Sequence, residues 1–509
     1  MMFSGIPFKT LTFIFAGAIA LPGTPSVFAA SGPNPEFNYN MGVATHFVRK
    51  GNMRHHDPVK YMPKVAELGV GWIRDEIMWN QVEQEKGKYS IPSTSTEWID
   101  LANRHGLKII AVFSGGNTRL YPDDPYDPDA YAKAVAFAAK ELRGKIHALE
   151  IVNEPFGHYA AAYGQGTKKG GAWYGREKDG STSGWVKRYV VLLNKAADAI
   201  RAVNPGIKII GLGSAPQVNY QQIALGVSPN VDGITAHPYS YKTPPEIVPY
   251  PGTPANRKRD GFVVTDEAGT FASLIEKYRE WSARYKGPRE IWLTEWGYTT
   301  YLEGTSRANY SGFTEEAQAV YSQRRFLECL GLGVDVSCQY VFLDKKHDTK
   351  GWDPRNSEHN FGLLRHDGTP RPVYHAVQRI AKSTLGFMPA TGADAPGVKV
   401  YPFSDRTERH PVVWDGDELP APNRIACYRF RDRDGKPVIA LWSMERVGDL
   451  NPRAADIEID IHPGSKIEVL DLMTGERYAP ETEARHGRLA LPLLQIPTHP
   501  LLLHVSVKK

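Results

Sequence analysis

Cysteine is scarce in this chain, with three residues, Cys329, Cys338 and Cys427, among 509. Three cysteines are too few for disulfides to hold a fold of this size together. Cys329 and Cys338 can pair if their geometry allows it, which sequence alone does not decide. Cys427 is expected to be a buried, small apolar residue.

Net charge is also low, at +5 from 61 basic and 56 acidic residues. No run of basic residues is interleaved with aromatic ones, so nucleic acid is not an expected partner. An acidic ligand is permitted by this balance but not required. The shares of 41% hydrophobic and 23% charged residues are typical of a soluble globular protein.

Long hydrophobic runs are missing, and none reaches the length of a membrane-spanning helix. The N-terminal run, Leu11 to Leu21, is short; Lys9 precedes it, and Ala29 and Ala30 follow it. This pattern is typical of a secretory signal peptide. We expect residues 1–30 to be removed and the remainder to be secreted or periplasmic. An uncleaved anchor at the membrane interface is the alternative.

Short apolar runs alternate with amphipathic stretches from about residue 40 to about residue 385. Continuous apolar runs are typical of parallel strands covered on both faces. The predicted strands are Gly42–His46, Val70–Asp75, Leu107–Phe113, Ile146–Asn153, Ile207–Gly213, Val231–His237, Glu290–Glu295 and Val334–Phe342.

Helix start signals lie between these runs. Asp57-Pro58 and Asp127-Pro128 each place a capping carboxylate before a first-turn proline. Thr314 precedes two glutamates that suit the positive end of a helix. Further predicted helices cover residues 93–105, 185–203, 270–285 and 371–383, with a weaker one at 219–226.

Eight strands alternating with about eight helices predict a (β/α)8 TIM barrel over residues 31–386. An open, doubly wound sheet is the alternative, but its usual glycine-rich turn after the first strand is missing. Helical periodicity fades after about residue 387, and "RIACYRFRDRDGKPVIALWSM" predicts two strands around an Asp-Gly turn. We therefore expect an antiparallel β-sandwich over residues 387–509.

Polar side chains gather where the predicted barrel strands end, which is the active face of such a barrel. These ends carry Arg74, Asn153, Glu154, His237, Tyr239, Glu295 and Trp296. Two carboxylates at one mouth suit the cleavage of a glycosidic bond. One protonates the leaving oxygen, and the other attacks the sugar or activates water. Asn153 offers hydrogen bonds to a sugar hydroxyl, and Trp296 offers a ring face.

Asn153-Glu154-Pro155 and Thr294-Glu295-Trp296-Gly297, in this order, resemble glycoside hydrolase clan A, the retaining barrel enzymes. The likeness extends to Arg74, to His237-Pro238-Tyr239 and to "NFGLLRHDGTPRPVYHAV" at 360–377. It is closest to family 39 and related exopolysaccharide hydrolases.

The resemblance implies that Glu154 is the general acid/base and Glu295 the nucleophile. Arg74, Asn153, His237, Tyr239 and Trp296 would bind the substrate, a polysaccharide or oligosaccharide, and no cofactor or metal would be needed. Many clan members have a tryptophan at the end of strand eight, where this chain offers Tyr340 or Phe342 instead.

Other interpretations of these residues stay open. Glu154 can be a structural, ion-paired carboxylate, Arg74 can merely pair with its acidic neighbours, and His237 can be a core histidine. A carbohydrate-binding protein without catalysis and a transglycosylase with the same glutamates are the alternative functions. His46, His55 and His56 have no carboxylate or cysteine at a ligand spacing, so no metal site is expected. The oligomeric state is left open.

Two long loops are predicted at the active face, at 164–184 and 241–261, and both are basic. Loops of such length in a compact domain are often functional. One hypothesis is that Arg257, Lys258 and Arg259 contact an anionic polysaccharide. A solvated basic surface is the equal alternative.

Overall fold

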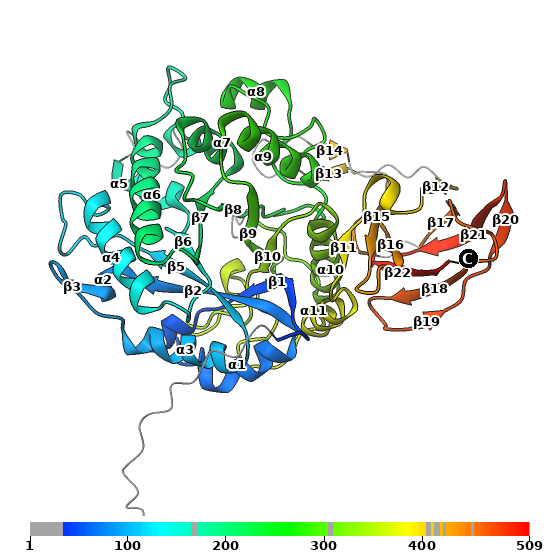
Figure 1. Ribbon diagram of the computed structural model, residues 1–509, viewed down its shortest axis with the longest axis horizontal. Helices are drawn as coiled ribbons and strands as arrows, with labels where there is room; N and C mark the ends of the chain where they lie inside the picture. Colours follow the sequence, from blue (N-terminus) through cyan, green and yellow to red (C-terminus); the bar gives the residue numbers. More distant parts are fainter. Residues whose placement is uncertain are drawn as a thin grey trace, which may run out of the picture.

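The computed structural model describes residues 34–163, 171–303, 309–403, 409–411, 418–420, 424–448 and 452–507. Its larger part is a closed barrel of parallel strands surrounded by helices, and its smaller part consists of antiparallel strands (Figure 1). The predicted TIM barrel with a C-terminal β-sandwich is confirmed. The predicted signal peptide, residues 1–30, lies outside the described residues. Within them, no helix combines the length and apolarity needed to cross a membrane.

The barrel strands overlap the predicted ones in every case. They are β1 (Asn38–Ala44), β2 (Val70–Met78), β5 (Lys108–Ser114), β6 (Ala148–Ile151), β7 (Lys208–Ser214), β8 (Gly233–Ala236), β9 (Glu290–Trp296) and β10 (Val336–Gln339). Strand β1 pairs in parallel with both β2 and β10, which closes the ring. This closure excludes the open doubly wound sheet.

The barrel interior is built in layers, because every second residue of a strand points inward. One layer is apolar and includes Trp72, Ala148, Trp292 and Cys338, with the two tryptophan rings edge to face at 5.2 Å between centroids. Gly42 of β1 allows the strands to approach here, because a Cβ atom would lie 2.6 Å from the Cys338 sulfur. This layer closes the barrel below the strand ends.

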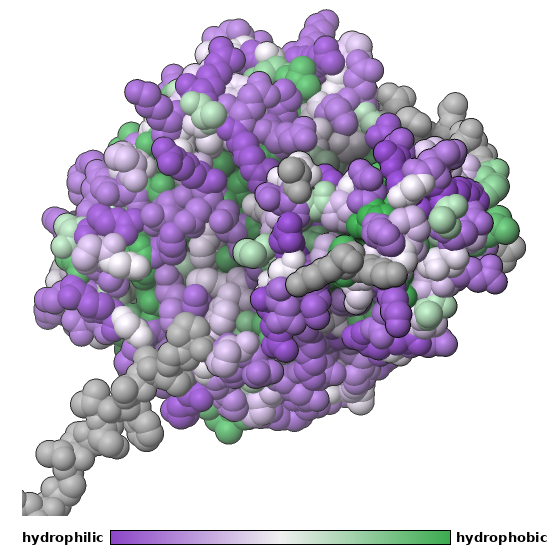
Figure 2. Space-filling model, turned by 45° about the vertical axis from the view of Figure 1, so that its right-hand side comes forward, coloured by the Kyte–Doolittle hydropathy of each residue, from purple (hydrophilic) through white to green (hydrophobic). Residues whose placement is uncertain are grey.

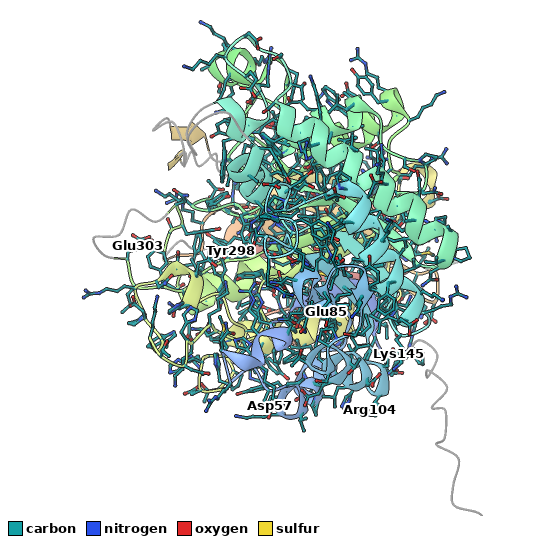
Figure 3. All side chains as sticks on the ribbon, turned by 90° about the vertical axis from the view of Figure 1, so that its left-hand side faces the viewer. Asp57, Glu85, Arg104, Lys145, Tyr298 and Glu303 are labelled. Carbon is teal, nitrogen blue, oxygen red and sulfur yellow. The ribbon has the colours of Figure 1, made fainter. Side chains whose placement is uncertain are left out.

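The predicted helices surround the barrel; three begin at the predicted capping residues, whereas the helix predicted at 219–226 begins earlier, at Pro216. They are α1 (Pro58–Glu67), α3 (Ser93–Arg104), α4 (Pro128–Glu141), α6 (Gly184–Val203), α7 (Pro216–Leu225), α9 (Phe271–Tyr285), α10 (Glu315–Gly331) and α11 (Pro372–Ser383). Asp57, Asp127 and Thr314 each accept a hydrogen bond from a backbone N–H of the first turn. In Figure 3, Asp57 at the start of α1 and Arg104 at the end of α3 lie at the same edge of the molecule.

Shorter elements were not predicted. They are α2 (Trp79–Val82), α5 (Pro155–Tyr163), α8 (Pro254–Asp260) and the hairpin of β3 (Glu83–Glu85) and β4 (Lys88–Tyr89). Within the described part of the chain, short 3-10 helices span Phe47–Gly51, Gly171–Tyr174, Ser357–His359 and Gly392–Asp394. The segments after β6 and β8 are therefore partly helical rather than simple loops.

The C-terminal part packs two antiparallel sheets face to face. One sheet orders β11 (Met388–Pro389), β15 (Ile425–Arg431), β16 (Pro437–Ser443), β22 (Leu501–Ser506), β18 (Lys466–Asp471) and β19 (Arg477–Tyr478). The other orders β12 (Val398–Pro402), β17 (Arg453–Ile459), β21 (Arg488–Ile496) and β20 (Glu483–Arg485). Strands β13 (Arg409–Pro411) and β14 (Glu418–Pro420) form a separate pair. The predicted hairpin is β15–β16, which turns at Gly435 with φ 77°.

Hydrophobic packing holds each sheet in place. Leu441 and Leu503 from one sheet meet Ile457 and Leu491 from the other in the sandwich core. The six-stranded sheet also packs on the barrel, because Trp442 belongs to the main barrel core. The face of the molecule seen in Figure 2 is mostly hydrophilic, with apolar residues in small patches. Cys329, Cys338 and Cys427 are all free thiols, so the possible Cys329–Cys338 disulfide is not formed.

A buried ion pair spans the junction of the barrel and the sandwich. Arg324 of α10 donates two hydrogen bonds to Glu246, which follows β8, and its Nε lies 2.8 Å from Oε1. From the sandwich, Trp442 Nε1 donates to Glu246 Oε1 at 2.7 Å, and the Glu445 carbonyl accepts from Arg324 Nη1 at 2.8 Å. Both charged side chains are almost completely buried, so each depends on its partner.

Breaking this ion pair should destabilise the protein strongly. Glu246→Ala leaves the Arg324 guanidinium buried without a counter-charge and is expected to lower the free energy of unfolding by about 3–5 kcal/mol. Urea unfolding followed by tryptophan fluorescence measures the change. Glu316→Ala removes an exposed carboxylate near the start of the same helix and serves as the control. Adding Arg324→Met to Glu246→Ala should restore most of the loss. A Glu246→Ala variant as stable as the control would contradict this account.

Candidate active site

A cavity of about 200 Å3 opens at the C-terminal ends of the barrel strands. Its lining is Thr45, His46, Arg49, Arg74, Asp75, Glu76, Asn153, Glu154, Tyr239, Glu295, Tyr310, Tyr340, Lys345 and Glu358. The structure therefore brings Arg74, Asn153, Glu154, Tyr239 and Glu295 together at one site, as the sequence analysis predicted. His237 and Trp296 are not in the lining.

Arg74 is the central residue of the cavity floor. Its guanidinium makes two hydrogen bonds to Glu150, with Nε at 2.7 Å from Oε2 and Nη2 at 3.1 Å from Oε1. It also donates to Glu295 Oε1 at 2.5 Å and to Asn153 Oδ1 at 2.7 Å. The planar, five-donor guanidinium is suited to such multiple recognition. Arg74 thus does more than pair with its sequence neighbours.

Glu150 is a functional residue that the sequence analysis missed. Its side chain is completely buried beneath the cavity. Burial raises the pKa of this carboxyl, but the charges of Arg74 and His237 outweigh that effect and bring the pKa down to about 2. Glu150 is therefore ionised throughout the neutral range. The available signal was a glutamate within an apolar strand, two residues beyond Ala148 and therefore on the same inward-facing side.

Glu295 is held as a carboxylate. Burial raises its pKa, yet nearby His237 and Arg74 more than compensate, so the pKa lies below its usual value. The Tyr239 hydroxyl donates to Oε2 at 3.0 Å, while Arg74 holds Oε1. Both oxygens are thus oriented by donors, and only about a tenth of the side chain is exposed. This environment suits a group that must stay charged.

Glu154 reaches the cavity through an unusual backbone. Val152 and Glu154 have φ values of 65° and 42°, in the left-handed region that side-chain-bearing residues rarely adopt. This turn at the end of β6 brings the Glu154 carboxylate over the cavity, with 34% of the side chain exposed. His237 Nδ1 donates to its Oε1 at 2.9 Å. One carboxylate oxygen of Glu154, one of Glu295 and a ring nitrogen of His237 all lie within 4.8 Å of one another.

His237 lies beneath the cavity rather than in it. Its side chain is 3% exposed, and its Nε2 lies 3.1 Å from Thr294 Oγ1. Burial lowers the pKa of the ring, but Glu295, Glu150 and Glu154 together raise it to about 10. His237 was predicted to bind the substrate; the structure instead places its ring below the cavity lining, in contact with Glu154. His237 is a buried imidazolium that binds carboxylates.

Metal binding has one geometric candidate among the described residues, the trio of Glu154, His237 and Glu295. Both ring nitrogens of His237 already face protein partners, with Nδ1 at 2.9 Å from Glu154 Oε1 and Nε2 at 3.1 Å from Thr294 Oγ1. The trio is better described as two carboxylates that share one cation. His46, His55 and His56 belong to no comparable group within the described ranges.

Trp296 was predicted to offer a ring face to a sugar, and this prediction is wrong. Its ring is buried, packs edge-on against Phe326 of α10 at 4.7 Å, and donates through Nε1 to Ser337 Oγ. The reason is a bulge in β9: Leu293 pairs with Ser337 and Trp296 with Gln339, so two β9 residues face one β10 residue. The bulge points Thr294 and Glu295 both inward and turns Trp296 outward.

Tyr340, rather than Phe342, is the aromatic residue near the end of β10 that faces the cavity. It lines the cavity, and its hydroxyl lies 3.4 Å from His46 Nε2. Phe342 is instead buried against Tyr61. The open choice between Tyr340 and Phe342 is thereby resolved in favour of Tyr340.

The predicted basic loop does not border the cavity. Arg257, Lys258 and Arg259 lie on α8 and are absent from the cavity lining. Arg259 makes two hydrogen bonds to Asp260 and stacks over Tyr174, while Arg257 Nε donates to the Gly252 carbonyl. This arrangement favours the solvated basic surface. In the other loop, residues 164–170 lie outside the described residues.

Comparisons with known proteins support the fold. No protein-family model matches the chain, and no curated protein matches its sequence. The structure of a family 39 glycoside hydrolase from the gut symbiont Bacteroides cellulosilyticus WH2 is similar over 94% of this chain and 82% of that chain, with a TM-score of 0.64 and 19% identity. The resemblance to family 39 inferred from the motifs is thus confirmed at the level of the fold.

Two further structures are less similar. A glucosidase from Croceicoccus marinus has a TM-score of 0.48 and 12% identity, covering 94% of this chain and 97% of that one. A family 1 β-glucosidase from Thermotoga maritima has a TM-score of 0.48 and 13% identity. The match covers 68% of this chain and 97% of that one.

The low pKa of Glu150 predicts a pH-dependent contribution to stability. Because the folded-state pKa, about 2, lies below the ordinary glutamate value of 4.5, this carboxylate stabilises the fold fully above about pH 5. Its contribution, on the order of 3 kcal/mol, disappears as the pH falls towards 2. The stability difference between the wild type and Glu150→Gln should therefore be large at pH 7 and shrink steadily below pH 5.

Urea unfolding at a series of pH values measures this difference. Glu141→Gln, an exposed substitution on α4, is the matched control and should track the wild type at every pH. A Glu150→Gln deficit that stays constant between pH 7 and pH 3 would show that Glu150 is not ionised in the folded protein.

Proposed function

We propose that this protein is a retaining glycoside hydrolase. The observation that carries the proposal is the short separation of two differently held carboxylates, whose nearest oxygens lie within 4.8 Å. Retaining enzymes place the two carboxyl groups about 5–5.5 Å apart, whereas inverting enzymes leave about 6.5–9.5 Å for a water molecule. The cavity between them suits a sugar ring bound at the reacting carbon.

In the first step, Glu295 attacks the anomeric carbon while Glu154 protonates the leaving oxygen. The roles follow from the environments. Glu295 is ionised and has both oxygens oriented by Arg74 and Tyr239, as a nucleophile requires. Glu154 has no contact with Arg74 among the described hydrogen bonds and projects into the cavity, where a leaving group can reach it. In the second step, Glu154 removes a proton from the water that releases the sugar.

Asn153 and Tyr239 complete the binding of the reacting sugar. Arg74 holds Asn153 Oδ1, so the amide nitrogen faces away from the guanidinium and can donate to a hydroxyl next to the reacting carbon. The Tyr239 hydroxyl sits beside the nucleophile oxygen that forms the covalent bond. Hydrogen bonds of this kind strengthen as charge develops in the transition state.

A neutral sugar at the reacting position fits the charge of the cavity. The lining carries three cationic residues, Arg49, Arg74 and Lys345, and five carboxyl groups. Arg49 is paired with Glu76 at 2.9 Å and Lys345 with Glu358 at 3.0 Å, so neither is left to attract an anion. The signal-peptide pattern of residues 1–30 supports export, so we place the substrate, a polysaccharide or oligosaccharide, outside the cytoplasm.

Removing the nucleophile should abolish hydrolysis. A panel of plant and bacterial polysaccharides and aryl β-glycosides is assayed for released reducing ends with the wild type, Glu295→Ala and the surface control Glu141→Gln. We expect Glu295→Ala to lose at least about a thousandfold in kcat, as nucleophile variants do, and the control to match the wild type. Binding of a glycan by both proteins without any release would instead identify a non-catalytic binding protein.

The stereochemical outcome tests the mechanism separately. Proton NMR of the first product formed from an aryl β-glycoside should show the β anomer before mutarotation, because two displacements restore the configuration. Initial appearance of the α anomer would exclude Glu295 as a nucleophile. Longer glycosides among the products would show that sugar competes with water, the transglycosylase alternative.

A further inference from the structure

A chain of hydrogen bonds runs beneath the cavity from Glu154 to Glu150. His237 Nδ1 lies 2.9 Å from Glu154 Oε1, and His237 Nε2 lies 3.1 Å from Thr294 Oγ1. Thr294 Oγ1 in turn lies 3.1 Å from Glu150 Oε1. Thr294 is completely buried on β9, directly before Glu295. Its hydroxyl touches neither the cavity nor any other group that the proposed reaction uses.

The direction of these hydrogen bonds is determined at the Glu150 end. Glu150 is ionised and accepts two hydrogen bonds from Arg74, so it is an acceptor and has no proton to donate. The single hydroxyl hydrogen of Thr294 must therefore point to Glu150. A lone pair of Thr294 Oγ1 then faces His237 Nε2, which must carry a hydrogen to form the bond.

We propose that Thr294 is a positioning residue that fixes the tautomer of His237, so that Nδ1 of the ring and Glu154 share the proton given to the leaving group. Because Nε2 keeps its hydrogen, Nδ1 is the one ring position that can release a proton. It faces Glu154 Oε1 at 2.9 Å. This inference rests on the proposed function, since only acid/base chemistry at Glu154 uses the shared proton.

The proton is conserved through the reaction. In the first step it moves from Nδ1 to Glu154 and on to the leaving oxygen as the glycosidic bond breaks and the bond to Glu295 forms. His237 is then neutral, with hydrogen on Nε2, and Glu154 is a carboxylate. In the second step the water attacks the anomeric carbon, the bond to Glu295 breaks and frees its carboxylate, and the water's proton passes to Glu154 and returns to Nδ1. No other donor or acceptor is required.

The charged groups around His237 favour this arrangement from three sides. Glu150 on β6 lies 3.8 Å from Nε2, and Glu295 at the end of β9 lies 3.9 Å from Nδ1. Arg74 of β2 lies behind both carboxylates and binds each of them. The other neutral tautomer, with a bare Nε2, would oblige the Thr294 hydroxyl to turn from the Glu150 carboxylate to the ring. In that tautomer the hydrogen on Nδ1 is the only one left on the neutral ring, so the ring could not give it to Glu154.

The pH dependence of kcat/KM tests the role of the hydroxyl, because it reports the ionisation of groups in the free enzyme. Thr294→Val keeps the β-branched shape and removes the acceptor for Nε2–H, while Thr294→Ser keeps the hydroxyl. We expect the alkaline limb of the kcat/KM profile to lie about one pH unit lower in Thr294→Val than in the wild type. A shift of this size corresponds to the loss of one charge-assisted hydrogen bond to the protonated ring. Thr294→Ser should retain the wild-type limb.

Two results would overturn the proposal. One is a Thr294→Val limb that coincides with that of the wild type. The other is a Thr294→Ser limb displaced as far as that of Thr294→Val, which would indicate side-chain packing rather than the hydroxyl. Equal thermal midpoints for the two variants establish that the comparison is made between folded proteins.

A measurement without substrate separates this inference from the proposed function. Protein labelled with nitrogen-15 in its histidine rings is titrated by NMR, with His237→Gln to assign the signals. In the wild type, deprotonation should remove the hydrogen from Nδ1 and leave Nε2–H in place. In Thr294→Val, deprotonation of the His237 ring should occur at lower pH and should leave a mixture of the two neutral tautomers. Loss of the Nε2 hydrogen in the wild type would refute the proposal, even if the protein hydrolyses glycosides. Retention of the Nε2 hydrogen in the wild type would support the proposal, even if no substrate is found.

Discussion

The buried ion pair between Arg74 and Glu150 is the interaction on which the site depends. Both side chains are almost completely buried, and a buried charge without its partner costs several kcal/mol. Paired with both oxygens of Glu150, the guanidinium has one orientation, and its remaining donors then point to Asn153 and Glu295. The same carboxylate orients Thr294 and helps to keep His237 charged. One ion pair thus determines the geometry and the charge of the whole cavity floor.

The layered interior of the barrel explains why such an ion pair can exist here. Residues two apart on a strand point to the same side, so the apolar Trp72, Ala148 and Trp292 are followed by the polar Arg74, Glu150 and Thr294. The apolar layer seals the barrel below, and the cavity opens above. Charges placed between the two layers are largely dehydrated, which strengthens their mutual attraction, while the nearby cavity admits a polar ligand.

Much of this architecture was predictable from the sequence, because it depends on local patterns. Apolar runs identified all the barrel strands, and Asp57, Asp127 and Thr314 marked helix starts by their capping chemistry. The carboxylates Glu154 and Glu295 were found because they stand at strand ends. The errors arose where pairing between strands decides the outcome. Trp296 was misplaced because the bulge of β9 is a property of its pairing with β10, which no single segment reveals.

His237 and Glu150 show a second limit of sequence interpretation. A histidine at a strand end suggests ligand contact, yet its role follows from the carboxylates that converge on it from β6 and β9. Likewise, a glutamate within an apolar run is interpretable only once Arg74 is known to lie opposite. Sequence separations of 76 and 221 residues divide Arg74 from Glu150 and Glu295. Such contacts come from closure of the barrel and not from any local pattern.

Glu154 and Glu295 differ in electrostatic environment because the cationic side chains of Arg74 and His237 contact them unequally. Glu295 receives Arg74, Tyr239 and the field of His237, which together stabilise its charge despite burial. Among the side chains that the structure describes, Glu154 receives a hydrogen bond from His237 only, and it is one third exposed. Environments that differ in this way assign separate acid and nucleophile roles to two residues of the same type. Since the imidazolium lies between them, the charge of one glutamate affects proton transfer at the other, and the pair acts as a unit.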